Sequence, residues 1–217
     1  VEVFAGPDEV AQAALDLWKQ RLQEAGEKFW VSLAGGSTPK ALYQRLAEAS
    51  DVDWSKVQLL GGDERFVAHD HADSNYRMVK ESLLDKVKVG FSRPWTILED
   101  AESSAQDYEN WLREEGPKPG VDFCLLGMGD DGHTASLFPE TAALDEEQRW
   151  AVANWVPKFE AHRLTLTLPY INEAREALFL VTGASKAQAL RQVLIEGSHP
   201  SSRVLAREVT RFYVDRA

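Results

Sequence analysis

The hydrophobic positions of this chain fall into short apolar runs separated by longer amphipathic segments. The apolar runs, each followed by glycine or a glycine-containing turn, predict buried strands at residues 29–34, 57–60, 123–126 and 178–181. Strict alternation at residues 163–168 predicts a further, half-buried strand. Apolar residues at helical spacing predict helices at residues 10–22, 39–47, 76–84, 108–112 and 186–195.

This alternation of strands and helices is typical of an α/β fold with a mainly parallel sheet covered on both faces. No repeat, low-complexity tract or linker divides the chain, so we expect a single domain over residues 1–217. Ligands of such folds bind beyond the carboxyl ends of the strands. Each polar motif described below follows a predicted strand, which is where this rule places a site.

Composition narrows the range of functions. The formal net charge of −11 argues against nucleic acid or an anionic membrane as a partner, since both attract basic surfaces. No apolar run reaches the ~18 residues of a membrane-spanning helix, and the first residues carry no signal-peptide pattern. The single cysteine, Cys124, lies in an apolar run and predicts a buried, inert thiol in a reducing compartment. We therefore expect a cytoplasmic protein.

The segment after the first buried strand has the composition of an anion site. Gly35 and Gly36 allow the backbone to approach a ligand closely. Ser37 and Thr38 supply hydroxyl groups and capping chemistry, and Pro39 suits the first position of a helix. Free amides, hydroxyls and the positive end of a helix together favour a phosphate group. The spacing is not that of a Walker loop, and a capped turn without a ligand is the alternative.

Lys186 follows another buried strand and opens another predicted helix. A lysine at that edge of the sheet can reach a phosphate on the turn at residues 35–38. Taken singly, the same residue also fits a solvated surface lysine.

Charged residues also follow the strand at 57–60. Asp63 could act as a base or hold a histidine, and Arg65 could bind phosphate or a developing oxyanion. An exposed ion pair, worth at most ~1 kcal/mol, is the alternative.

Farther along, His69 and His71 could bind zinc, but a closed metal site needs additional ligands. The residues at 73–74 fit a helix cap instead.

The loop after the third predicted strand, from Gly127 to His133, matches the G-x-G-x-x-G pattern of dinucleotide-binding proteins. That interpretation is poor, because Asp130 and Asp131 would face the pyrophosphate. A catalytic interpretation fits better. The imidazole of His133 has an ordinary pKa near ~6.5, which suits proton transfer at neutral pH, and Asp131 could orient the ring or raise its basicity. A buried histidine bonded to the backbone is the alternative.

Together these segments resemble the 6-phosphogluconolactonase family. The resemblance rests on residues 34–39, 62–65, 73–75, 127–139, 163–169 and 182–186, in order over most of the chain. It implies a Rossmann-like three-layer α/β/α fold related to glucosamine-6-phosphate deaminases and ribose-5-phosphate isomerases. It also implies hydrolysis of 6-phospho-D-glucono-1,5-lactone to 6-phospho-D-gluconate, the second step of the oxidative pentose phosphate pathway, without a metal or an organic cofactor.

For this activity we expect a phosphosugar lactone as the partner and a monomer or weak homo-oligomer as the active form. The substrate-binding residues would be Gly35, Gly36, Ser37, Thr38, Arg65, Arg163 and Lys186. The catalytic residues would be His133, Asp131 and Asp63.

Two further functions remain as alternatives beside a metal-dependent hydrolase. Glucosamine-6-phosphate deaminases share the phosphate turn and the glycine loop, but they resemble one another in a tyrosine at the position of Arg65. They also carry a glutamate five residues past the histidine, where this chain has Phe138. A non-catalytic phosphosugar-binding regulator would keep the phosphate turn without needing Asp63, Asp131 and His133 together.

Overall fold

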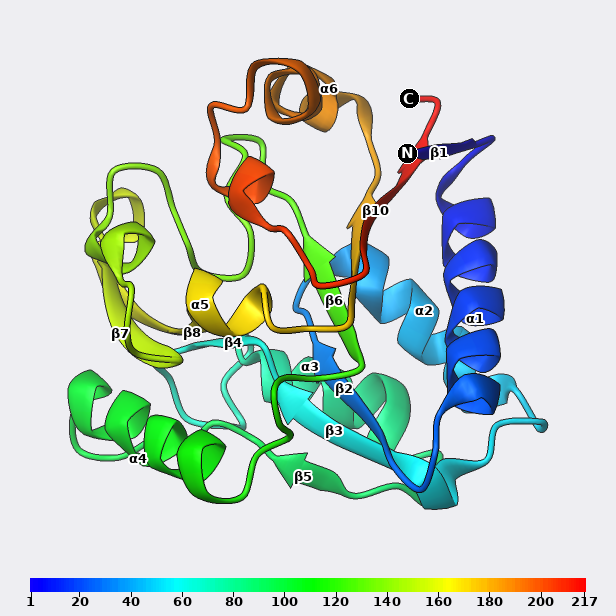
Figure 1. The fold of residues 1–217 in the computed structure, drawn as a ribbon, viewed down its shortest axis with the longest axis horizontal. Helices are drawn as coiled ribbons and strands as arrows, with labels where there is room; N and C mark the ends of the chain where they lie inside the picture. Colours follow the sequence, from blue (N-terminus) through cyan, green and yellow to red (C-terminus); the bar gives the residue numbers. More distant parts are fainter.

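The computed structural model describes residues 1–217, which form two sheets with their flanking helices (Figure 1). The larger sheet has seven parallel strands in the order β1-β10-β9-β6-β2-β3-β5. These strands are β1 (Glu2–Phe4), β2 (Phe29–Leu33), β3 (Val57–Gly61), β5 (Phe91–Arg93), β6 (Phe123–Gly127), β9 (Glu176–Val181) and β10 (Val209–Asp215). The smaller sheet is antiparallel, in the order β4-β8-β7, and consists of β4 (Asp63–Arg65), β7 (Ala151–Val156) and β8 (Ala161–Leu166).

Helices connect most of the strands. The α-helices are α1 (Pro7–Glu24), α2 (Ser37–Glu48), α3 (Asn75–Val79), α4 (Ala101–Glu114), α5 (Leu168–Ile171) and α6 (Ala187–Arg191). Two π-helical segments, η2 (Lys80–Leu84) and η6 (Gln192–Glu196), continue α3 and α6. Short 3₁₀ turns are η1 (Trp54–Lys56), η3 (Ala142–Asp145), η4 (Pro157–Phe159), η5 (Ala184–Lys186) and η7 (Pro200–Arg203). None of the helices combines the length and the apolar composition that a membrane crossing requires.

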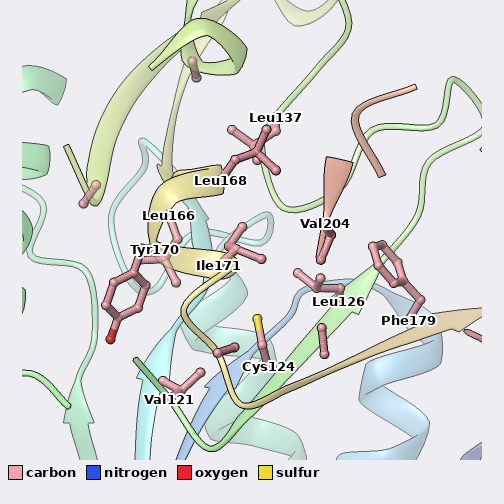
Figure 2. Packing of buried hydrophobic residues seen from close by; sticks show 14 of the residues in the cluster. Val121, Cys124, Leu126, Leu137, Leu166, Leu168, Tyr170, Ile171, Phe179 and Val204 are labelled. Atoms are coloured by element: carbon pink, nitrogen blue, oxygen red, sulfur yellow. The ribbon is translucent and has the colours of Figure 1, made fainter. Parts of the chain in front are cut away.

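The central strands separate two hydrophobic clusters, because successive side chains of a strand point to opposite faces. Phe123 and Leu125 of β6 pack with residues of α1 and α2 on one face. Cys124 and Leu126 pack on the other face, against α5 and the smaller sheet (Figure 2). The predicted α/β fold with both faces of a parallel sheet covered is thus confirmed. The second face differs in detail, since the three-stranded sheet and α5 share it with α4.

The expected buried strands are present within one or two residues, as β2, β3, β6 and β9. The strand expected at residues 163–168 was placed too late in the chain. It runs from Ala161 to Leu166, and Thr167 then caps α5, in which Pro169 occupies the second position. A proline in this first turn is tolerated because the amide it lacks has no partner within the helix.

The helices also differ from the expected ranges at their ends. Residues 108–112 are only the second half of α4, whose first turns are largely polar and gave no apolar pattern. The segment at 186–195 is divided into the end of η5, then α6 and η6. The sequence predicted Pro39 at the first position of its helix. Helix α2 instead begins at Ser37, so Pro39 is its third residue.

Candidate active site

A cavity of about 240 Å³ opens at the carboxyl ends of β2, β6 and β9, where α/β folds bind ligands. This volume lies slightly below the range of about 300–1,000 Å³ that is usual for small-ligand sites. The predicted site residues that line it are Gly35, Gly36, Ser37, Thr38, Asp63, Arg65, His133 and Lys186. Asp131 and Arg163 do not line it. The phosphate turn and the candidate base therefore belong to one cavity, as the sequence interpretation required.

The turn between β2 and α2 presents the start of a helix to the cavity. Gly36 is the N-cap residue and has φ of +105°, a conformation that favours glycine. No side chain caps α2, so the amide groups of its first turn are available to a ligand. The helix dipole adds a partial positive charge at this end, which favours an anion.

Asn75 closes one side of the same turn. A β-carbon on Gly35 would lie 2.1 Å from the Oδ1 atom of Asn75, so only glycine leaves room for this side chain. The Asn75 amide donates to the backbone oxygen of Asp63 at 3.0 Å and lies 3.4 Å from its carboxylate. Asn75 lines the cavity and is almost fully buried. Its backbone amide donates to the buried Glu64 carboxylate at 2.7 Å. Asn75 belongs to the segment at residues 73–75 that carries part of the family resemblance, but no role was predicted for it.

Lys186 enters the cavity from the turn after β9. Gly183 has φ of +96°, and its amide donates to Asp215 at 3.0 Å, which fixes this turn. The hydroxyl of Thr182, another cavity residue, lies 2.7 Å from the hydroxyl of Thr38. The turns after β2 and β9 are therefore joined beside Lys186, and a phosphate on α2 would lie within the same cavity as its ammonium group.

Arg65 and Arg163 lie opposite each other on β4 and β8. Arg65 lines the cavity and donates to the backbone oxygen of Asp73. The guanidinium of Arg163 lies over the ring of Phe159, 5.1 Å from its centre. Burial lowers the pKa of Arg163, and the charge of Arg65 lowers it further. Arg163 does not line the cavity, and its predicted contact with the substrate stays a prediction.

The carboxylate of Asp63 is held on both sides at the cavity wall. Ser136 donates to Oδ2 at 2.8 Å, and the Asn75 amide lies beside Oδ1. Ser136 is itself buried in the loop after His133. Asp63 forms no hydrogen bond with His133, so the structure does not bear out an aligning role for Asp63. The contact with Ser136 was missed, because it joins residues far apart in the chain.

His133 and Asp131 form a compact pair in the loop after β6. Nδ1 of His133 lies 2.5 Å from Oδ1 of Asp131, and no protein atom bonds Nε2. A β-carbon on Gly129 would lie 2.0 Å from Nδ1, so the loop closes tightly around the ring. Burial alone would raise the pKa of Asp131. The hydrogen bond with His133 and the ammonium of Lys158 outweigh burial and lower that pKa to about 2.

One face of the His133 imidazole is covered by an aromatic ring. Phe138 stacks on His133 with ring centres 4.0 Å apart and is almost fully buried. This is the position at which the deaminases carry a glutamate. The structure thus places a hydrophobic surface, and no carboxylate, at that side of the histidine.

The remaining candidate groups of the sequence lie in other contacts. Nε2 of His69 bonds the backbone oxygen of Trp95 at 2.6 Å, and Nδ1 of His71 accepts from the Asp73 amide at 3.1 Å. The chain gathers no set of three or more histidine, cysteine or carboxylate groups suited to a metal ion. Cys124 is buried in the core, as predicted, and burial raises the pKa of its thiol to about 12.

Comparison with known proteins gives consistent relatives. Residues 5–213 match the family model described as glucosamine-6-phosphate isomerases/6-phosphogluconolactonase. A 6-phosphogluconolactonase of Synechocystis sp. is 45% identical over 179 residues, which cover 78% of this chain and 73% of that protein. The crystal structure of a 6-phosphogluconolactonase from Shewanella baltica has a TM-score of 0.89 and 30% identity, covering 99% of this chain and 96% of that one.

A more distant neighbour concerns the fold alone. A monomeric glucosamine-6-phosphate deaminase has a TM-score of 0.84 at 22% identity and covers 99% of this chain and 96% of that one. The relation of the fold to the deaminases, which the resemblance implied, is therefore confirmed.

Proposed function

This chain belongs to the glucosamine-6-phosphate isomerase/6-phosphogluconolactonase family, and we propose that it hydrolyses 6-phospho-D-glucono-1,5-lactone to 6-phospho-D-gluconate. This reaction is the second step of the oxidative pentose phosphate pathway. The observation that carries the proposal is the shared cavity of the phosphate turn at residues 35–38 and the Asp131–His133 pair. Relatives named 6-phosphogluconolactonase at up to 45% identity support the same activity.

The phosphate end of the substrate is expected on the turn between β2 and α2. The amides and hydroxyls of Ser37 and Thr38 would donate to the phosphate, and Lys186 and Arg65 would supply positive charge. Anchoring the phosphate fixes the lactone ring relative to the base, so binding energy is converted into positioning. Arg163, which does not line the cavity, would contribute through its charge.

His133 is the proposed general base. Asp131 holds Nδ1, so the free Nε2 takes a proton from a water molecule that attacks the lactone carbonyl. A C–O bond forms, and the carbonyl oxygen becomes an oxyanion that Arg65 or backbone amides stabilise. The tetrahedral centre then collapses, the bond to the ring oxygen breaks, and the imidazolium returns its proton to that oxygen.

Asp63 has a separate place in this scheme. Its carboxylate is held by Ser136 and Asn75, and it lines the cavity. A fixed carboxylate of this kind can accept hydrogen bonds from sugar hydroxyls or share in proton transfer. The absence of a carboxylate at Phe138 disfavours the ring-opening chemistry of the deaminases, which leaves hydrolysis as the better-supported reaction.

Acid release from freshly prepared 6-phosphogluconolactone tests this proposal, measured with and without EDTA. We expect hydrolysis well above the spontaneous rate in both conditions, since the proposed mechanism uses no metal or organic cofactor. His133→Ala should lower kcat by about 10²–10⁴ and change KM little. A wild-type rate equal to the spontaneous one would eliminate the lactonase function, and loss of activity only with EDTA would support a metal-dependent hydrolase.

The proposal includes a cytoplasmic location and a monomeric or weakly associated form. Composition supports the location, through the single buried cysteine and the acidic charge. Sedimentation velocity at enzyme concentrations used in the assay tests the assembly state, and a stable dimer at those concentrations would correct it.

A further inference from the structure

The tip of the hairpin between β7 and β8 contacts the catalytic pair from outside the cavity. This tip is η4 (Pro157–Phe159), followed by Glu160 in a left-handed conformation with φ of +47°. The ammonium of Lys158 lies 3.0 Å from Oδ2 of Asp131 and 3.5 Å from Asp130. His133 occupies the other oxygen of the same carboxylate, at 2.5 Å. The Asp131 carboxylate thus bridges an imidazole and an ammonium group.

The neighbouring aromatic residue of the tip supports the same histidine from a second direction. Phe159 contacts Phe138 edge to face, with ring centres 5.6 Å apart, and Phe138 stacks on His133. The guanidinium of Arg163 also lies over the ring of Phe159. The hairpin tip therefore contacts the imidazole through a charged path and an aromatic path, although neither Lys158 nor Phe159 lines the cavity.

We propose that Lys158 is a positioning residue of this site. It holds the Asp131 carboxylate in place and partly compensates the negative charge that acts on His133. The reasoning is electrostatic. An uncompensated carboxylate stabilises a protonated imidazole, and a neighbouring ammonium partly cancels this effect. Removal of the Lys158 ammonium should therefore favour the protonated imidazole, which cannot act as a base. Asp131 itself stays ionised, because its pKa is about 2.

Other charged groups surround the Asp131–His133 pair, and the substitutions of Lys158 described below leave them unchanged. Asp130 shares Lys158 on the same loop. His199 packs against Gly132 of that loop. The remaining ones line the cavity and are Asp63, Arg65 and Lys186. Because Lys158 alone among the cations forms an ion pair with Asp131, its removal is the change that isolates the proposed effect.

The test compares Lys158→Met, which keeps the stem and removes the charge, with Lys158→Arg, which keeps the charge. The Lys158 side chain is 51% exposed, so water and salt screen its electric field. We therefore expect the midpoint of the acid limb of kcat/KM to shift by about half a pH unit when the charge is removed. In Lys158→Met, the acid limb of kcat/KM should move to higher pH by that amount. Activity below the midpoint should then fall about threefold. Lys158→Arg should keep the midpoint within about 0.2 unit, and 0.5 M salt should reduce the difference between wild type and Lys158→Met.

A second measurement follows the imidazole directly in the absence of substrate. The ring signals of His133 are identified by their loss in His133→Asn and titrated by NMR in wild type and both Lys158 variants. The same upward shift in Lys158→Met supports the proposal. Coincident titrations of wild type and Lys158→Met would overturn it, as would an equal loss of kcat at every pH without movement of the midpoint.

The kinetic arm rests on the proposed lactonase function, and the NMR arm does not. If wild type releases no acid while Lys158→Met shifts the titration, the lactonase function fails and the role of Lys158 stands. If wild type is active and the titration does not shift, the role of Lys158 fails and the lactonase function stands.

Discussion

Replacing Gly35 with alanine should damage the site through a single buried neighbour. The added β-carbon would lie 2.1 Å from Oδ1, 2.5 Å from Cγ and 2.7 Å from Nδ2 of Asn75. Gly35 has no positive φ, so its backbone accommodates alanine and the collision is the whole effect. The Asn75 amide group must move away, because its backbone is held at 2.7 Å by the buried Glu64.

The expected cost follows from the contacts that this movement breaks. Loss of the 3.0 Å hydrogen bond from Asn75 to Asp63 costs about 1 kcal/mol. Overpacking in this nearly closed space adds about 1–3 kcal/mol. Gly35→Ala should therefore lower the free energy of unfolding by about 2–4 kcal/mol. For a chain of this length the melting temperature should fall by about 4–16 °C.

A double-mutant cycle measures whether Asn75 is the cause. Asn75→Ala removes all three colliding atoms, so adding Gly35→Ala in that background should cost less than about 1 kcal/mol. The coupling between the two positions should then exceed about 1 kcal/mol, measured by urea unfolding followed through tryptophan fluorescence. Costs that add to within about 0.5 kcal/mol would refute the reasoning, because they would show that the turn, and not Asn75, resists the β-carbon.

Two further predictions concern single side chains. Lys186→Ala should raise KM for the lactone about tenfold or more and change kcat little, since its proposed role is to anchor the phosphate at a distance from the base; an unchanged KM in steady-state kinetics would remove it from the anion site. Cys124 should resist a thiol reagent at pH 8 in the native protein and react once urea unfolds the chain, because burial raises its pKa to about 12; rapid labelling of the native protein would contradict its buried position.

The parallel core of the fold could be predicted because each of its strands is buried on both faces. Such strands are continuous apolar runs, as in β6 and β9. The edge of the sheet lacks this signal. Strand β1 has three residues, and β10 mixes Thr210 and Arg211 into its first half, so neither gave an apolar run. The pairing of β1 with β10 joins the two ends of the chain, and a local sequence pattern cannot predict such a contact.

The candidate site could be predicted where one segment supplies both partners of a contact. Asp131 and His133 are two residues apart, and a tight glycine loop brings them together. Contacts between distant segments were missed, such as the hydrogen bond from Ser136 to Asp63 across 73 positions. The position of Arg163 outside the cavity has a related cause. Its place on β8 was anticipated, but its contact with Phe159 depends on the hairpin tip.

Unpaired charge explains how an acidic protein can hold a phosphorylated ligand. Many arginines elsewhere form salt bridges with carboxylates, as Arg93 does with Asp107. Arg65 and Lys186 form no salt bridge, although the chain carries a net charge of −11. The field of distant carboxylates decays within the Debye length of about 8 Å at physiological salt, so nearby groups dominate inside the cavity. In the proposed binding mode, a phosphate there would meet a helix N-terminus and two cations without a salt-bridge partner, while the Asp63 carboxylate lies at another part of the wall. The helix end and the two cations would favour an anionic group over a basic one.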